Sequence, residues 1–241
     1  MKKTVSLTFA GQAGFILESS SGYRVGIDLY LSDCCNRYFG FKRLMPYVFN
    51  SQELDLDLLV ATHAHYDHFD PDSVPIVMSN NKTHLVAACD VKSEAKRLNL
   101  KSERITYLKE GQVFKNENIC IKAVPCDHGE ETPDAIGLLI EIDSKRIYII
   151  GDSAYREDYF KNSEFENLDV LIMPINGAYG NMNEVEGAKA AGVIKPKLCV
   201  PCHYWNFAQH GGNPHIFTQQ MQKKYPDLAY NLMCMGEKVQ L

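Results

Sequence analysis

Histidine and aspartate side chains crowd into one short segment, V-A-T-H-A-H-Y-D-H-F-D at residues 60–70. The chain of 241 residues has eight histidines, and His63, His65 and His68 fall within six consecutive positions together with Asp67. Imidazole and carboxylate groups are ligands that zinc, manganese and iron share. The segment therefore predicts a site for a divalent metal ion, presented just after the apolar run L-D-L-L-V-A.

The spacing within this segment indicates two binding positions. In an extended chain, residues i and i+2 point to the same side, so His63 and His65 are expected to hold one ion from one edge. If the chain then turns, Asp67 and His68 face a second position. Asp70 falls outside this pattern and is expected to be a cap or a loop residue.

Three further candidate ligands follow apolar runs elsewhere in the chain. His128 lies in P-C-D-H-G, Asp152 in G-D-S-A-Y and His203 in P-C-H-Y-W, each just past a predicted strand. If these strands share one orientation, their ends converge on one edge of the fold. His84 opens a strand and His215 lies in a helix, so both are expected to be structural.

The predicted secondary-structure elements that must position these side chains are mostly strands at first, and helices follow later in the chain. No internal repeat or Pro/Gly/Ser linker divides the sequence, which predicts a single domain over residues 1–241. Two mixed sheets packed together with helices outside, an α/β sandwich, account for this order. Strands are predicted at 4–9, 14–17, 24–27, before the histidine cluster from 57, at 83–89, repeatedly within 104–150, and at 170–174 and 198–201. Helices are predicted from Asp90, over 183–192 and from Asn213, with Asp90, Asn183 and Asn213 as N-caps, whereas 29–52 is irregular and D-S-K is a hairpin turn.

Composition narrows the function classes. The net charge is −5 and the basic residues are scattered, so no nucleic-acid partner is expected. The sequence has no run of 18 apolar residues, so no membrane span is expected. The N-terminus is predicted to form a strand and not an export signal. Eight cysteines without an export signal favour reduced thiols and a cytoplasmic location. Cys199 and Cys202 form a lone C-x-x-C and are expected to be ordinary buried thiols.

The ligand pattern T-H-A-H-Y-D-H, C-D-H, G-D-S and C-H resembles that of the metallo-β-lactamase superfamily, in the same order and over nearly the whole chain. The resemblance implies a four-layer αββα sandwich with two mixed sheets. Asp28, in V-G-I-D, matches an early acidic residue of that superfamily. The ligand sets that the resemblance implies are His63, His65 and His128 for a first metal, Asp67, His68 and His203 for a second, and Asp152 as a bridge between them.

Finer motifs resemble the L-ascorbate 6-phosphate lactonase group within that superfamily. They are G-Q-A-G-F, D-L-Y-L-S-D, A-T-H-A-H-Y-D-H-F-D, G-D-S-A-Y, N-G-A-Y-G and P-C-H-Y-W-N-F. The G-D-S motif argues against antibiotic hydrolysis, because β-lactamases of the superfamily commonly lack an aspartate at the bridging position. The expected function is a metal-dependent hydrolase acting on an ester or lactone, with a sugar-phosphate lactone as the model substrate.

The predicted reaction uses a hydroxide that bridges the metals beside Asp152, with Asp67 orienting it. A divalent pair lowers the pKa of water from about 15.7 to about 7. Two divalent ions, two aspartates and one hydroxide leave about +1 at the centre, so an anionic small molecule is expected. One or two divalent ions are predicted. Zinc or manganese is the preferred metal, and iron is an alternative. Candidate substrate contacts are Tyr179, Asn181, Tyr204, Trp205, Arg156 and His210.

Two alternative functions remain open from the sequence. One is a phosphodiesterase or nuclease on the same dinuclear site, which would need a basic arm or exosite. The other is a non-hydrolytic metal or redox module using Cys199 and Cys202. The sequence determines neither the metal nor the oligomeric state.

Overall fold

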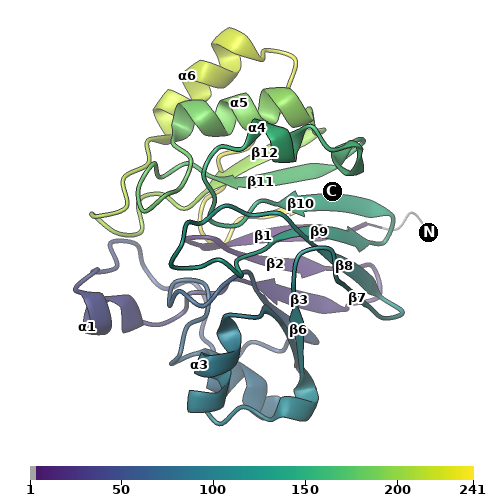
Figure 1. Cartoon of the computed structure of the whole chain (residues 1–241), viewed down its shortest axis with the longest axis vertical. Coiled ribbons are helices and arrows are strands. Elements are labelled where there is room, and N and C mark those ends of the chain that lie inside the picture. The colour runs from purple at the N-terminus through teal and green to yellow at the C-terminus, as the bar shows by residue number, and fades with distance from the viewer. Residues whose placement is uncertain (1–3) are drawn as a thin grey trace.

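Two mixed β-sheets form the centre of the computed structural model, which describes residues 4–241 (Figure 1). The first sheet has the strand order β13-β1-β2-β3-β4-β5-β6 and the second has the order β12-β11-β10-β9-β8-β7. The first comprises β1 (Ser6–Gly11), β2 (Gly14–Glu18), β3 (Arg24–Ile27), β4 (Leu58–Ala61), β5 (His84–Ala88), β6 (Ile105–Leu108) and β13 (Lys238–Gln240). The second comprises β7 (Val113–Lys115), β8 (Ile119–Val124), β9 (Gly137–Ile142), β10 (Lys145–Ile149), β11 (Val170–Pro174) and β12 (Leu198–Cys202).

Both sheets combine antiparallel hairpins with parallel crossovers. In the first sheet β1, β2 and β3 are antiparallel, whereas β3, β4, β5 and β6 are parallel. In the second sheet β7 to β10 are antiparallel, and β10, β11 and β12 are parallel. Parallel strands end at the same edge of a sheet, so the segments that follow β4, β10 and β12 can meet between the two sheets.

Helices cover the outer face of each sheet, and Figure 1 shows α3 below the strands and α5 and α6 above them. The helices are α1 (Cys34–Phe39), α2 (Val74–Val77), α3 (Val91–Arg97), α4 (Glu157–Phe160), α5 (Glu184–Ile194) and α6 (Pro214–Lys224). Short 3₁₀ turns occupy Met78–Asn80, Ser102–Arg104 and Ser163–Phe165.

Three apolar clusters lie between these layers. One fills the space between the sheets, with Phe15 and Val60 from the first sheet against Ile140 from the second. A second packs α5 and α6 on the outer face of the second sheet, and a third packs α2 and α3 on the outer face of the first. Three cores between four layers define the αββα sandwich that the sequence predicted.

Most predicted elements are present, and local signals explain why. Asp143 and Ser144 both have positive φ, which forms the tight turn predicted between β9 and β10. Asn183 caps α5 in a reciprocal capping box with Glu186, and the Asn213 side chain accepts from His215 N at the start of α6.

Three sequence predictions differ from the structure. Asp90 sits at the start of α3 but makes no capping bond, because its carboxylate instead accepts from Ala64 N in the histidine loop. The stretch 29–52, predicted to be irregular, contains the helical turn α1, which is too short to leave a periodic pattern. The first strand begins at Ser6, and residues 1–3 of the N-terminal prediction lie outside the described residues.

Cys199 and Cys202 point to opposite faces of β12, because residues three apart on a strand alternate sides. Cys199 packs under the helices and Cys202 packs between the sheets, and all eight cysteines are free thiols. The C-x-x-C pair therefore cannot close a disulfide in this fold. Within residues 4–241, no helix is long and apolar enough to cross a membrane.

Candidate metal centre

The candidate ligands are delivered by turns at the ends of strands from both sheets. The histidine loop follows β4 of the first sheet, while His128, Asp152 and His203 follow β8, β10 and β12 of the second. Gly151 has φ +76, and this left-handed turn brings Asp152 out of β10 towards the first sheet.

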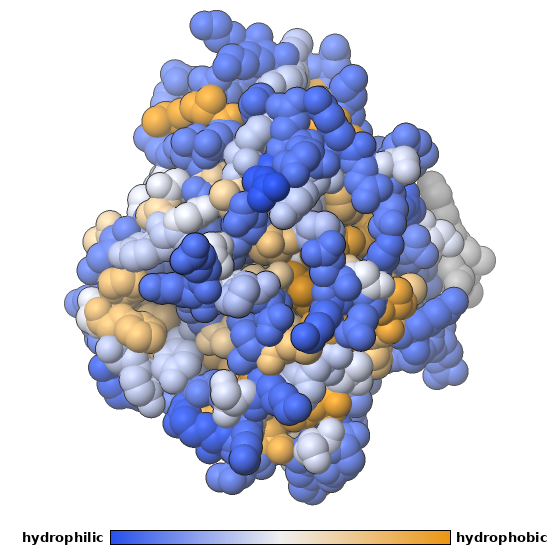
Figure 2. Space-filling model, in the orientation of Figure 1, coloured by the Kyte–Doolittle hydropathy of each residue, from blue (hydrophilic) through white to orange (hydrophobic). Residues whose placement is uncertain are grey.

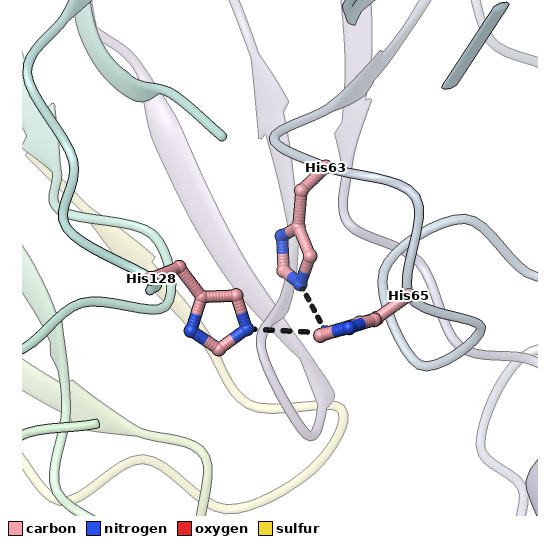
Figure 3. A group of neighbouring side chains, drawn as sticks. All are labelled: His63, His65 and His128. Atoms are coloured by element: carbon pink, nitrogen blue, oxygen red, sulfur yellow. Dashed lines mark hydrogen bonds between the residues drawn. The ribbon is translucent and has the colours of Figure 1, made fainter. Parts of the chain in front are cut away.

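His63, His65 and His128 form the first group, and Figure 3 shows their rings directed at one another. Nδ1 of His65 lies 3.0 Å from Nε2 of His63 and 3.1 Å from Nε2 of His128. The rings of His63 and His128 are buried and His65 is exposed. Three ring nitrogens therefore converge on one small space that is open to solvent through His65.

Asp67, His68, Asp152 and His203 form the second group. Nε2 of His203 lies 3.4 Å from Nε2 of His68 and 3.3 Å from Oδ2 of Asp67. Asp152 lies between the two groups: its Oδ1 is 3.3 Å from His68, and its Oδ2 is 3.2 Å from His203 and 3.8 Å from His128. The predicted bridging position is thus the central one in space.

Asp28 and Thr62 orient two of the histidines from behind. The buried Asp28 carboxylate accepts from the Thr62 hydroxyl at 2.7 Å and from His68 Nδ1 at 2.9 Å. Because the single hydroxyl proton of Thr62 points to Asp28, its oxygen accepts from His63 Nδ1, 3.1 Å away. When the two imidazoles are neutral, both Nε2 lone pairs therefore face the centre, as metal ligation requires.

Gln12 forms hydrogen bonds to the second group, and the sequence analysis assigned no function to this residue. It is fully buried in the turn between β1 and β2, with φ 55, and its Nε2 donates to Asp67 Oδ2 at 2.8 Å. The same nitrogen lies 3.1 Å from His210 Nδ1, while the backbone oxygen of Gln12 accepts from His203 N. Its only sequence signal was a polar residue inside the turn G-Q-A-G.

Burial and neighbouring charges shift the pKa values of the histidines differently in the two groups. Burial lowers the pKa of His63 well below its usual range and lowers that of His128 to about 4. At His203 burial also disfavours the charged ring, but the Asp152 and Asp67 carboxylates outweigh it and raise the pKa to about 9. Burial would raise the pKa of Asp152, yet His203 and His68 hold it well below its usual range.

The donor set fits one or two divalent cations. Two ligand atoms on one tetrahedral zinc ion lie about 3.3 Å apart, given bonds of about 2.0–2.1 Å. Six ligand-atom pairs of these groups are separated by 3.0–3.4 Å, and two more, His68–Asp67 and His128–Asp152, by 3.8 Å. Nδ1 of His65 faces two other ring nitrogens at once, and a cation satisfies all three lone pairs. The chemistry, imidazole with carboxylate, is that of zinc, manganese or iron sites.

A cavity of about 590 Å³ opens over these groups. Of the predicted substrate contacts, Tyr179 and His210 line it. The other lining residues include the candidate ligands His65, Asp67, His128, Asp152 and His203, together with Cys35, Phe39, Phe41, Tyr66, Gly129, Glu130, Glu131 and Gly180.

The other predicted substrate contacts lie elsewhere. Tyr204 is buried among the side chains under α5 and α6, and Trp205 lines a separate depression with Leu44. Arg156 is engaged by the carboxylates of Asp127 and Asp158. None of these three residues lines the cavity: Tyr204 and Trp205 lie away from it directly after His203, and the Arg156 side chain is held by its two carboxylate partners.

Asn181 and Asp70 have distinct placements. Asn181 is buried next to the cavity-lining Gly180, and its side-chain nitrogen and oxygen have no hydrogen-bond partner among the described residues. Asp70 is buried and accepts from Leu31 N at 2.9 Å and from the Ser32 hydroxyl at 2.7 Å. Asp70 is therefore a loop residue, as predicted, and it ties the segment before α1 to the histidine loop.

Residues 6–203 match the family model of the beta-lactamase superfamily domain. Among solved structures, Igni18, a metallo hydrolase from the archaeon Ignicoccus hospitalis, has a TM-score of 0.77 at 23% identity, covering 99% of this chain and 98% of that chain. The metallo-beta-lactamase fold protein YhfI from Bacillus subtilis has a TM-score of 0.75 at 17% identity, covering 99% and 100%. The fold and the family match define a member of the metallo-β-lactamase superfamily.

A curated relative identifies the narrower family. A UPF0173 metal-dependent hydrolase of Thermus thermophilus is 31% identical over 178 residues, which cover 71% of this chain and 76% of the relative. This chain belongs to the UPF0173 metal-dependent hydrolase family. The predicted superfamily is confirmed, whereas the resemblance to the L-ascorbate 6-phosphate lactonase group stays a prediction.

Proposed function

We propose that this metal-dependent hydrolase cleaves an ester or lactone bond in a small molecule. The observation that carries the proposal is Asp152, placed between two groups of converging histidines at the floor of an open cavity. When bound, one or two divalent ions, zinc or manganese first, acidify water and polarise a substrate oxygen.

The residues of this chain have separate tasks in the proposal. His63, His65 and His128 would hold one ion, and Asp67, His68 and His203 would hold the other, with Asp152 available to both groups. Gln12 fixes Asp67 by a hydrogen bond, which keeps that carboxylate in position to orient the attacking nucleophile. Asp28 and Thr62 keep two of the rings oriented.

Two features argue against the alternative functions. Among residues 4–241, no lysine or arginine lines the cavity, whereas a nuclease holds phosphates with such groups. The thiols of Cys199 and Cys202 lie on opposite sheet faces, which leaves the redox module without its disulfide.

Eight free thiols support a reducing compartment, and we propose a cytoplasmic location.

The test is a panel of aryl esters, lactones and phosphodiesters on protein loaded with manganese or zinc. His65→Ala removes a candidate ligand, and His215→Ala, at an exposed helical position, is the matched control. We expect ester or lactone hydrolysis that His65→Ala lowers by at least about 100-fold and His215→Ala leaves intact. Hydrolysis of the phosphodiesters alone, or full activity in His65→Ala, would overturn the proposal.

A further inference from the structure

Four aromatic side chains, Phe39, Phe41, Tyr66 and Tyr179, form a continuous wall of the cavity, here called the aromatic wall. The ring centroids are 5.5 Å apart for Tyr66 and Phe39, 6.2 Å for Phe39 and Phe41, and 5.7 Å for Phe41 and Tyr179. Such spacings are contact distances for aromatic pairs. Figure 2 shows an apolar patch at the left of the molecule, over the region of α1, the helix that ends at Phe39.

The aromatic wall is anchored to the fold. The Phe41 ring packs 6.1 Å from Phe207, which is buried. Arg43, two residues further on, donates to the Tyr30 backbone oxygen at 2.6 Å and lies over the Tyr30 ring. A wall held in this way can select substrates by shape and polarity without first folding around them.

The charges that line the cavity oppose an anionic substrate. The lining has four carboxylates, Asp67, Glu130, Glu131 and Asp152, and within the described chain it has no lysine or arginine. Two divalent ions would bring four positive charges against these four negative ones. The predicted excess of about +1 counted Asp67, Asp152 and one hydroxide, so including the exposed Glu130 and Glu131 turns it into about −1. Proteins that bind phosphate or carboxylate groups commonly use arginine or lysine for it.

We propose that the cavity selects neutral esters or lactones bearing an aryl or short alkyl group, which packs on the aromatic wall. The proposal rests on the hydrolase function above and replaces the anionic substrate expected from the sequence. Apolar groups gain from burial against the rings, whereas anions meet the negative ring faces and the two glutamates at once.

The first experiment uses two esters that differ in one group. 4-Nitrophenyl butyrate ends in a methyl group, and 4-nitrophenyl hydrogen succinate ends in a carboxylate at the same place. On manganese-loaded protein we expect kcat/KM to favour the butyrate by at least about 10-fold. Glu130→Gln combined with Glu131→Gln should narrow that ratio by about threefold or more, because two repelling charges are removed.

The aromatic wall is tested with Tyr179→Ala and Phe41→Ala. Tyr179 is 56% exposed, so its truncation leaves the core packing intact, and Val113→Ala at a 51% exposed position of β7 is the control. Each wall variant should raise KM for the butyrate by about 5-fold or more, and the control should not. Equal kinetics for wall variants and unsubstituted protein, or a preference for the succinate, would overturn the proposal.

A binding measurement on metal-free protein separates this proposal from the hydrolase function. Butyranilide and succinanilic acid copy the two esters as stable amides, and calorimetry reports their affinities. We expect butyranilide to bind more tightly and to lose affinity in Tyr179→Ala. If neither ester is hydrolysed but this preference holds, the hydrolase function fails and the cavity selectivity stands. If the esters are hydrolysed but succinanilic acid binds equally well, the selectivity fails and the function stands.

Discussion

At the scale of single residues, the Asp28 carboxylate fixes the orientation of the His68 ring. Its carboxylate is buried and bonds both the Thr62 hydroxyl and His68 Nδ1. Asp28→Asn keeps the shape but removes the charge that fixes this ring. Loss of a carboxylate behind a ligating histidine typically costs about 10–100-fold in metal affinity, and we expect that range here.

A competition titration with a chromophoric chelator measures this affinity. Asp57→Asn is the control, because the Asp57 carboxylate also accepts a backbone N–H, that of Arg24, but lies at the opposite end of β4 from the histidine loop. An unchanged affinity in Asp28→Asn would mean that His68 does not ligate the metal.

His203 contributes to the pH dependence of metal uptake together with His68, whose pKa neighbouring carboxylates, Asp152 first, also raise well above its usual range against the effect of burial. Burial disfavours the charged ring of His203, but Asp152 and Asp67 raise its pKa to about 9, so the ring is protonated at pH 7 in metal-free protein. A metal ion binds the neutral ring only, so uptake must displace this proton. Manganese affinity should therefore rise as the pH increases towards about 9, with protons released on binding.

The proton count follows from calorimetry in two buffers that differ in ionisation enthalpy. The same raised pKa stabilises the metal-free fold fully below the unfolded pKa of about 6.5, and this contribution is lost as the pH rises through about 9. Metal-free protein should accordingly melt at a lower temperature at pH 9 than at pH 7. His203→Ala should release fewer protons, and equal proton release would rule out His203 as their source.

The residues that could be predicted from the sequence are those whose signal is local. His63, His65, Asp67 and His68 stand in one short motif, and the structure brings them together as expected. Gln12 and Phe41 stand alone in their segments, and only the tertiary fold brings them to the cavity or to Asp67. No spacing rule reaches across that separation.

At the scale of elements, the turn after β10 carries a specific constraint. Gly151 has φ +76, and a Cβ placed there would lie 3.1 Å from the backbone oxygen of Ile136. We expect Gly151→Ala to destabilise the fold by about 2–3 kcal/mol, from the strained φ together with the close contact. Gly22→Ala is the control, because Gly22 has φ +85 with no neighbour within 4 Å, and it should cost only about 1 kcal/mol.

Chemical denaturation measures both free energies of unfolding. Equal losses for the two variants would show that the contact with Ile136 relaxes at no cost.

Elements with a strong hydrophobic period or with distinct turn and cap residues could be predicted from the sequence, whereas elements without these signals could not. The β9–β10 hairpin and the capped helix α5 were predicted because the turn and cap residues act locally. α1 has six residues, and β13 has three residues paired with β1 from the far end of the chain. Neither is long enough to show a period, and β13 exists only because the tertiary fold supplies its partner.

At the scale of the whole molecule, the candidate ligands join two separate sheets. His63, His65, Asp67 and His68 follow the first sheet, whereas His128, Asp152 and His203 follow the second. Binding therefore stabilises the packing between sheets in addition to the loops. At a free metal concentration of about 100 times Kd, the gain is about 2.7 kcal/mol.

Removal of the metal with a chelator should lower Tm by about 5–10 °C, a shift that differential scanning calorimetry resolves. Adding manganese back should restore it, whereas His65→Ala protein should not respond. An unchanged Tm after verified metal removal would contradict ligation by both sheets.

The position of His203 also has a consequence for biosynthesis. The first sheet is encoded almost wholly before residue 109, yet the second set of ligands closes only with His203. A ribosome must therefore make most of the chain before the second metal position exists. A nascent chain that has emerged only as far as β6 carries the histidine loop without its partners, so full metal loading cannot precede the synthesis of His203.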